Sequence, residues 1–119
     1  MKRSLAVIFV VLAALSLVGS AQAATPGQRN ALSKAKDYLS FTSFSKSGLA
    51  DQLKYDGFSR SEARWAVNHV RVSWRAQAVK KAKDYLDLTS FSRQGLIEQL
   101  EYDGFTHRQA RYGVTKAYR

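Results

Sequence analysis

The chain has 119 residues, contains no cysteine, and carries 19 lysines and arginines against 9 aspartates and glutamates, for a formal charge of +10. The absence of cysteine excludes disulfide bridges and thiolate metal sites, so side-chain packing alone must stabilise so small a chain. The charge favours anionic partners such as wall polymers, lipid headgroups, acidic protein surfaces or DNA, although a solvated surface that aids solubility explains it equally well.

The first 23 residues have the pattern of a secretory signal peptide. Lys2 and Arg3 precede an apolar run at residues 5–18, and an A-x-A cleavage site ends at Ala23. An uncleaved membrane anchor is the alternative, but this run of 14 residues is shorter than the roughly 20 that span a bilayer. Cleavage removes Lys2 and Arg3, which leaves 96 residues with 17 basic and 9 acidic side chains and a formal charge of +8.

Residues 31–70 and 78–117 are two copies of one sequence at a constant offset of 47 positions. AKDYL, TSFS and YDGF at 35–39, 42–45 and 55–58 return at 82–86, 89–92 and 102–105. We place the first repeat at 24–72 and the second at 73–119. Such an array typically presents a surface, which favours a binding role. Because modules of about 40 residues are near the lower limit for independent folding, we expect the copies to share part of their core.

Three helices are predicted in each repeat. The first has apolar residues on one face, at Ala31, Ala35, Tyr38 and Leu39 and at Ala78, Ala82, Tyr85 and Leu86. The second begins after an N-cap serine that lies in a hydrophobic staple, Ser45 or Ser92, and ends at a glycine with positive φ, Gly57 or Gly104. The third begins after a capping box, formed by Ser59 with Glu62 and by Thr106 with Gln109.

The third helix has a narrow stripe of small apolar residues, at Ala63, Ala66, Val67 and Val70 and at Ala110, Gly113, Val114 and Ala117. Neither glycine nor proline occurs at residues 60–86, so this helix could continue into the second repeat as a rod of roughly 40 Å. Asn68 and Ser73 mark where it would break instead. The predicted fold is all-α, a tandem of two small three-helix, helix-turn-helix-like modules that a continuous helix could join.

The sequence offers no recognisable catalytic or metal-binding motif. His69 and His107 are not at matching positions in the repeats, and there is no HExxH motif or Gly-rich phosphate loop. The carboxylates that occur in both copies could form an acid and base pair, but an aspartate before a glycine turn favours local hydrogen bonding. These carboxylates are Asp37, Asp56, Asp84 and Asp103. We therefore expect a non-enzymatic protein without catalytic residues, metal or cofactor.

Arg64 and Arg111 occupy matching positions on the third helix and are candidate contact residues. One interpretation is a pair of receptors for anions or carboxylates. The other, which we favour, is a salt bridge to Asp56 or Asp103 in the preceding turn.

The aromatic residues divide into a core group and a contact group. Large side chains are needed to bury enough area in so small a domain, so we assign Tyr55, Phe58, Tyr102 and Phe105 to the core. Trp65 and Trp74 lie outside the small-residue stripe, and Trp74 is in the segment between the repeats. We consider both tryptophans as partly exposed contact residues.

The run YL…TSFSKSGLADQLKYDGFSRSEARWAV, repeated as YL…TSFSRQGLIEQLEYDGFTHRQARYGV, resembles the Ltp family of host cell surface-exposed lipoproteins. The resemblance covers both repeats and rests on the motifs FS-x-x-GL, YDGF and A-R-aromatic-A/G-V. It implies tandem three-helix modules outside the cytoplasmic membrane. It also implies a role in superinfection exclusion, in which prophage-encoded members stop phage DNA from entering by engaging the injection machinery, including the tape measure protein.

One position departs from the lipoprotein pattern. A lipobox requires a cysteine, and Ser20 follows Leu17-Val18-Gly19 here, so we expect a secreted, periplasmic or surface-associated protein without a lipid anchor.

Our leading hypothesis is an exported binding module that blocks phage DNA injection, with the phage injection machinery or tape measure protein as partner. The alternative is a cationic envelope module that binds anionic cell-wall polymer or lipid headgroups. Export disfavours specific nucleic-acid binding, although a basic helical face would bind DNA nonspecifically at low salt.

Overall fold

The computed structural model describes residues 23–118. The predicted signal peptide lies almost entirely at residues 1–22, outside the described residues. Residues 23–118 form six helices and no strand. The first repeat consists of α2 (Pro26–Phe41), α3 (Lys46–Tyr55) and α4 (Arg60–His69), and the second of α5 (Trp74–Leu88), α6 (Arg93–Tyr102) and α7 (His107–Ala117). The predicted all-α tandem of three-helix modules is therefore confirmed.

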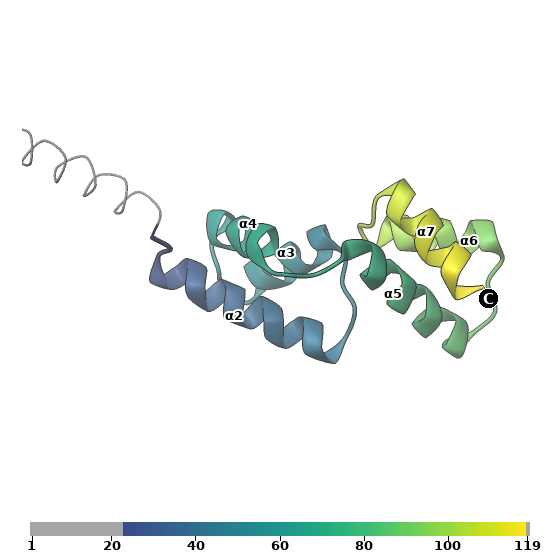
Figure 1. Cartoon of the computed structure of the whole chain (residues 1–119), viewed down its shortest axis with the longest axis horizontal. Coiled ribbons are helices and arrows are strands. Elements are labelled where there is room, and N and C mark those ends of the chain that lie inside the picture. The colour runs from purple at the N-terminus through teal and green to yellow at the C-terminus, as the bar shows by residue number, and fades with distance from the viewer. Residues whose placement is uncertain (1–22, 119) are drawn as a thin grey trace, which may run out of the picture.

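The repeats lie side by side along the molecule, and each has the same arrangement of helices (Figure 1). The long first helix packs against the third, α2 against α4 and α5 against α7, and the second helix packs against both. Small residues allow the close packing of first and third helices. A Cβ at Gly113 of α7 would lie only 2.7 Å from the backbone of Ala78 in α5.

Side-chain caps begin the second and third helices at the residues that the sequence pattern indicates. The hydroxyls of Ser45 and Ser92 accept hydrogen bonds of 2.9 Å from the amides of Gly48 and Gly95. Reciprocal capping boxes begin α4 at Ser59 and α7 at Thr106. These bonds satisfy amides that a helix N-terminus leaves without a partner.

A glycine ends the second helix of each repeat. Gly57 and Gly104 both have a φ of 103°, a conformation that a side chain strains. The amide of Gly57 bonds to the Lys54 carbonyl and the amide of Phe58 to the Leu53 carbonyl, which is the Schellman pattern. The third helix of the first repeat begins at Arg60, two residues after Phe58. The turn therefore sets the orientation of α4 relative to α3 as both pack on α2.

The helices α4 and α5 are separate, so the continuous rod does not form. Val70 is extended, with φ −68° and ψ 136°, and the Ser73 hydroxyl accepts a hydrogen bond from the amide of Ala76 at the start of α5. Two β-branched residues, Val70 and Val72, disfavour helix in the connecting segment. The break is therefore near Ser73, one of the two positions that the sequence marked for it.

Each repeat has its own apolar core, and no buried apolar residue belongs to both. The first core comprises Ala31, Ala35, Leu49, Leu53, Ala63, Ala66 and Val67. The second comprises Ala78, Ala82, Leu96, Leu100, Phe105, Ala110 and Val114. The expectation of a shared buried core is therefore wrong, because the pairing of small-residue faces within a repeat already buries its leucines. Trp74 is a partial exception, since it starts α5 but packs, half-buried, against the first core.

Hydrogen bonds join the two repeats. The hydroxyls of Ser45 and Ser47 donate to the carbonyls of Asp103 and Gly104 at 2.6 and 3.1 Å, and the Gln77 side chain accepts from the Phe44 amide at 3.1 Å. Ser45 and Gln77 are buried. The matching residues in the other repeat, Ser92 and Asn30, are exposed. This inter-repeat contact thus explains a difference in burial between otherwise equivalent positions.

None of the described helices has the length and apolar character of a membrane span.

Candidate functional site

A cleft of about 630 Å³ lies between the two repeats. It is lined by α3 and α4 of the first repeat and by the turn before α7 of the second, and we call it the inter-repeat groove. Buried or half-buried apolar residues contribute to it, namely Ala50, Ala63 and Val67. The second repeat contributes Gly104, Thr106 and Gln109. The first repeat therefore forms most of the groove, and the second repeat completes it.

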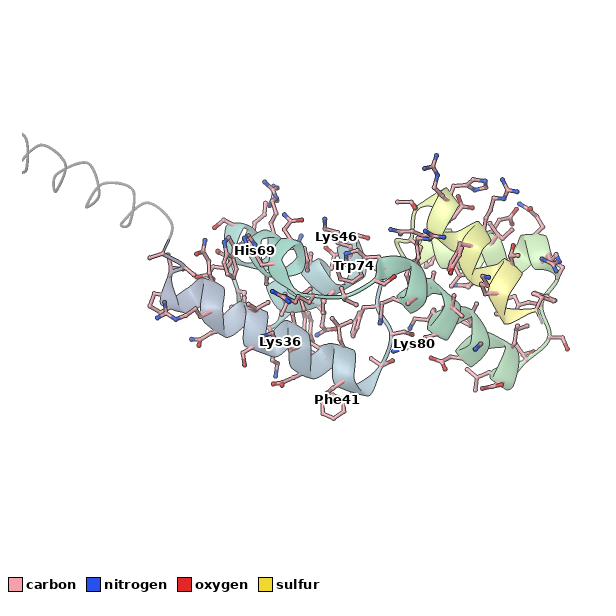
Figure 2. All side chains as sticks on the ribbon, in the orientation of Figure 1. Lys36, Phe41, Lys46, His69, Trp74 and Lys80 are labelled. Carbon is pink, nitrogen blue, oxygen red and sulfur yellow. The ribbon has the colours of Figure 1, made fainter. Side chains whose placement is uncertain are left out.

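Four exposed basic residues also line the inter-repeat groove, namely Lys46, Lys54, Arg60 and Arg64. The one acidic residue in its lining, Asp51, forms an ion pair with Lys54 at 3.1 Å. Figure 2 labels Lys46 where the first repeat adjoins the second. The groove thus combines an apolar part with an excess of positive charge.

The matching surface of the second repeat is not basic. Lys54 and Arg60 correspond to Glu101 and His107, which form a hydrogen-bonded pair at 3.1 Å. Asp51 corresponds to Glu98, while Lys46 and Arg64 correspond to Arg93 and Arg111. Because both repeats fold with these different side chains, the fold does not require the positive charge of the groove.

The predicted salt bridges of Arg64 and Arg111 to the turn aspartates are wrong. The Asp56 carboxylate accepts a hydrogen bond of 2.5 Å from the Tyr38 hydroxyl, and Asp103 accepts one of 2.6 Å from Tyr85. Side-chain ion pairs within residues 23–118 are Lys54–Asp51 and His107–Glu101. The turn aspartates therefore bond to the first helix of their repeat, and neither arginine is held in an ion pair there.

The tyrosine–aspartate pairs change the acidity of the tyrosines. The hydrogen bond that the Tyr38 hydroxyl donates to Asp56 is the main cause of the raised pKa of Tyr38. Burial, followed by the hydrogen bond to Asp103, raises the pKa of Tyr85 to about 12. Gln52 and Gln99 bond to the same hydroxyls at 3.2 Å. These clusters connect the first helix to the glycine turn, which is a structural role.

The arrangement does not bring the repeated carboxylates together as an acid and base pair. Asp56 and Asp103 bond within their own repeats, and Asp84 lies 3.5 Å from the hydroxyl of Ser43. Within the described part of the chain, no group of three or more histidines and carboxylates is placed to hold a metal ion.

The two tryptophans have different surroundings. Trp65 is half-buried and stacks on His69, with ring centroids 4.0 Å apart and planes at 13°. Trp74 packs against the first core, so it serves to connect the repeats. Figure 2 shows Trp74 in the middle of the molecule and His69 further from the second repeat.

Tyr112, at the position matching Trp65, lies in a basic surface of the second repeat. Arg75 and Lys116 lie over its ring, 4.0 and 5.6 Å from the centroid. Lys80 and Lys83 line the same cleft of about 540 Å³, and its described lining contains no carboxylate. We call these five residues the second-repeat basic face. Arg111 lines a smaller cleft of about 450 Å³ that Tyr112 also lines, whereas Arg64 lines the inter-repeat groove. The two matching arginines therefore do not belong to one cleft.

The assignment of Tyr55 and Tyr102 to the core is wrong, because both are 88% exposed. Leu53 points inward, and a residue two positions later on a helix lies about 200° around its axis. Phe58 and Phe105 do pack on the cores, half-buried and buried respectively. Sequence reasoning also missed Phe41 and Leu88, another matching pair, which are 84% and 82% exposed. Figure 2 shows the Phe41 ring directed away from the protein.

Comparisons with known proteins agree with the two-repeat architecture. The model of the Ltp family, described as host cell surface-exposed lipoprotein, matches residues 27–70 and again residues 73–116. Among solved structures, the chain is similar to Ltp, a superinfection exclusion protein from the Streptococcus thermophilus temperate phage TP-J34. The two share 36% sequence identity with a TM-score of 0.73, and the match covers 78% of this chain and 97% of the other. No curated protein matches this chain.

Proposed function

Because this chain belongs to the Ltp family of host cell surface-exposed lipoproteins, we propose that it is a non-enzymatic binding protein of superinfection exclusion. It acts outside the cytoplasmic membrane and stops phage DNA from entering by binding the phage injection machinery, with the tape measure protein as the expected component. The observation that carries this proposal is the similarity to a superinfection exclusion protein over 97% of the length of that chain.

Exposed aromatic residues support a role in binding. Tyr55 and Tyr102 lie at matching positions, and neither is used in a core. Tyrosine and arginine are enriched among residues that dominate binding energy at protein interfaces. Arg64 lines the inter-repeat groove, so this surface offers an arginine for binding.

In this proposal the protein is exported by a signal peptide that is then cleaved, and it carries no lipid anchor. Ser20 stands where a lipobox would have cysteine, and the sequence contains no cysteine at all. Mass spectrometry of exported protein should find an unmodified N-terminus at Ala24. A retained signal segment would contradict this route.

The exclusion step can be separated from attachment by experiment. The full chain is expressed in a phage-sensitive host, and its export is verified by immunoblotting of the cell-surface and medium fractions. We expect phage adsorption to be unchanged and intracellular phage DNA to fall, because an exported module meets the injection apparatus only after attachment. Normal DNA injection by several phage types into cells that export the protein would reject the proposal.

A second candidate function is binding to an anionic envelope polymer or to anionic lipid headgroups. The second-repeat basic face supports it, because a cleft lined by four cationic side chains and no carboxylate attracts a polyanion. Binding of this kind should weaken steeply between about 50 and 200 mM salt as counterions are released. The substitutions Arg75→Gln and Lys80→Ser introduce the residues at matching positions 28 and 33, so they remove charge while the first repeat shows that the fold accepts them. Salt-resistant binding that survives both substitutions would exclude this face as the polymer site.

A further inference from the structure

We infer that the inter-repeat groove binds a short acidic segment of a partner protein, one that also carries small apolar side chains. The inference rests on the proposed function only for the identity of the partner, which would then be a component of the phage injection machinery.

The groove is a feature of the assembled tandem. Its walls come from α3 and α4 on one side and from Gly104, Thr106 and Gln109 on the other. Its two sides are held together by the bonds from Ser45 and Ser47 to the turn before α7. A volume of about 630 Å³ is in the range of ligand-binding clefts, and most such clefts are largely formed before the ligand arrives.

The charge of the groove indicates an acidic occupant. Lys46, Arg60 and Arg64 make no ion pair with any described residue, while Lys54 is paired with Asp51. The second repeat has Glu101 and His107 in place of Lys54 and Arg60, so at these matching positions only the first repeat, which forms most of the groove lining, is basic. Carboxylates on a partner would gain charge-assisted hydrogen bonds from these side chains.

The apolar part of the groove favours a protein segment over a phosphate polymer. Ala50 is half-buried and leaves apolar surface in the lining, while Ala63 and Val67, which also line the groove, are buried. A polyphosphate or a polyol phosphate has no apolar side chain to cover this surface, whereas a peptide covers it with alanine, valine or leucine and directs its carboxylates to the basic residues. The cleft of the second-repeat basic face has the half-buried Val79 and the exposed Ala76 in its lining but no carboxylate, so it is better suited to a polyanion.

The test measures binding of a short labelled peptide, in which glutamate alternates with alanine and leucine, to the mature protein by fluorescence anisotropy. The double substitution Lys54→Glu and Arg60→His introduces the residues of matching positions 101 and 107, so a folded product is expected. Because close charge pairs dominate such contacts, we expect it to weaken peptide binding by about tenfold or more. A control, Lys36→Glu, makes the same change of charge as Lys54→Glu at an exposed residue of α2 that does not line the groove, and should change the affinity less than about threefold.

A neutral substitution provides an independent test. Ala50→Ile introduces the residue of matching position 97 and narrows the groove without changing charge. We expect it to weaken binding of the acidic peptide by about fivefold or more, while circular dichroism shows an unchanged fold. Equal binding by all variants, or a loss that Lys36→Glu reproduces in full, would overturn the inference. So would inorganic polyphosphate that binds more tightly than the peptide and competes with it at the groove.

The phage assay separates this inference from the proposed function. If the groove variants no longer bind the peptide and also allow phage DNA injection, both proposals are supported. If they no longer bind the peptide while exclusion persists, the groove of the unaltered protein is still a site for an acidic segment, but the partner in exclusion binds elsewhere. If the unaltered protein excludes no phage, the proposed function fails while the peptide measurements continue to decide the groove.

Discussion

The Ser45 hydroxyl donates a hydrogen bond of 2.6 Å to the backbone carbonyl of Asp103, 58 residues further along the chain. The same oxygen accepts a hydrogen bond from the amide of Gly48 and caps α3. One side chain therefore begins a helix in the first repeat and holds the glycine turn of the second. Its counterpart Ser92 caps α6 in the same way but is exposed.

Substitution of the two cap serines should separate these roles. Ser92→Ala removes a cap alone, at a cost of about 1 kcal/mol in the free energy of unfolding. The buried Ser45 also donates to the Asp103 carbonyl, and Ser45→Ala removes this bond, so we expect about 1 kcal/mol of further destabilisation. Urea unfolding followed by circular dichroism measures both. Equal losses would show that the inter-repeat bond adds no stability.

The two turn glycines provide a second matched pair. Both have a φ of 103°, so Gly57→Ala should cost about 1–3 kcal/mol through backbone strain. Nothing lies within 4 Å of a Cβ at Gly57, but a Cβ at Gly104 would lie 2.2 Å from the Ser47 hydroxyl and 2.6 Å from that of Ser45. We expect Gly104→Ala to cost about 1 kcal/mol more and to shift the NMR amide signals of the serines. Identical melting temperatures and unshifted serine signals would contradict the close approach of the repeats.

The acidity of Tyr85 predicts a dependence of stability on alkaline pH. Its pKa is raised from 10.0 to about 12 by burial and by the hydrogen bond to Asp103. Because the pKa is higher in the folded state, the resulting stabilisation is fully present below pH 10 and is lost as pH rises through about 12. Ultraviolet absorbance of tyrosinate, compared with Tyr85→Phe, should show the late titration. Asp103→Asn should lower the pKa only in part, since burial remains. Ionisation of Tyr85 near pH 10 would show that the cluster does not form.

The tryptophans should differ in their effect on stability. Trp74 packs against the first core from the start of α5, so Trp74→Ala should lower the free energy of unfolding by about 2 kcal/mol and loosen the link between repeats. Trp65→Ala removes a stack on His69 at the surface and should cost about 1 kcal/mol. Thermal unfolding measures the first effect, and small-angle X-ray scattering would detect a wider spread of inter-repeat distances. Greater destabilisation by Trp65→Ala would reverse the two assignments.

Local signals account for most of what the sequence predicted correctly. Caps and glycine turns involve residues no more than five positions apart, as in the bond from Phe58 to Leu53, so their chemistry is readable in the residue order. The repeat itself doubled each signal, since Ser45 and Ser92 or Gly57 and Gly104 predict the same element twice. The sequence indicates the break near Ser73 less clearly. A serine can cap the N-terminus of a new helix, as Ser73 does, or it can lie inside a continuous helix as a weak helix former.

The sequence by itself determined the six helices and their duplication, because helix ends and apolar stripes depend on neighbours along the chain. Only the tertiary structure decided which partner each polar or aromatic side chain takes. Asp56 lies close enough in sequence to pair with Arg64, yet it bonds to Tyr38, 18 residues away. Tyr55 resembles a core residue by size, yet it is exposed because Leu53 fills the inward position. The inter-repeat groove likewise depends on contacts between distant residues, such as Ser47 and Gly104, for which the sequence holds no local signal.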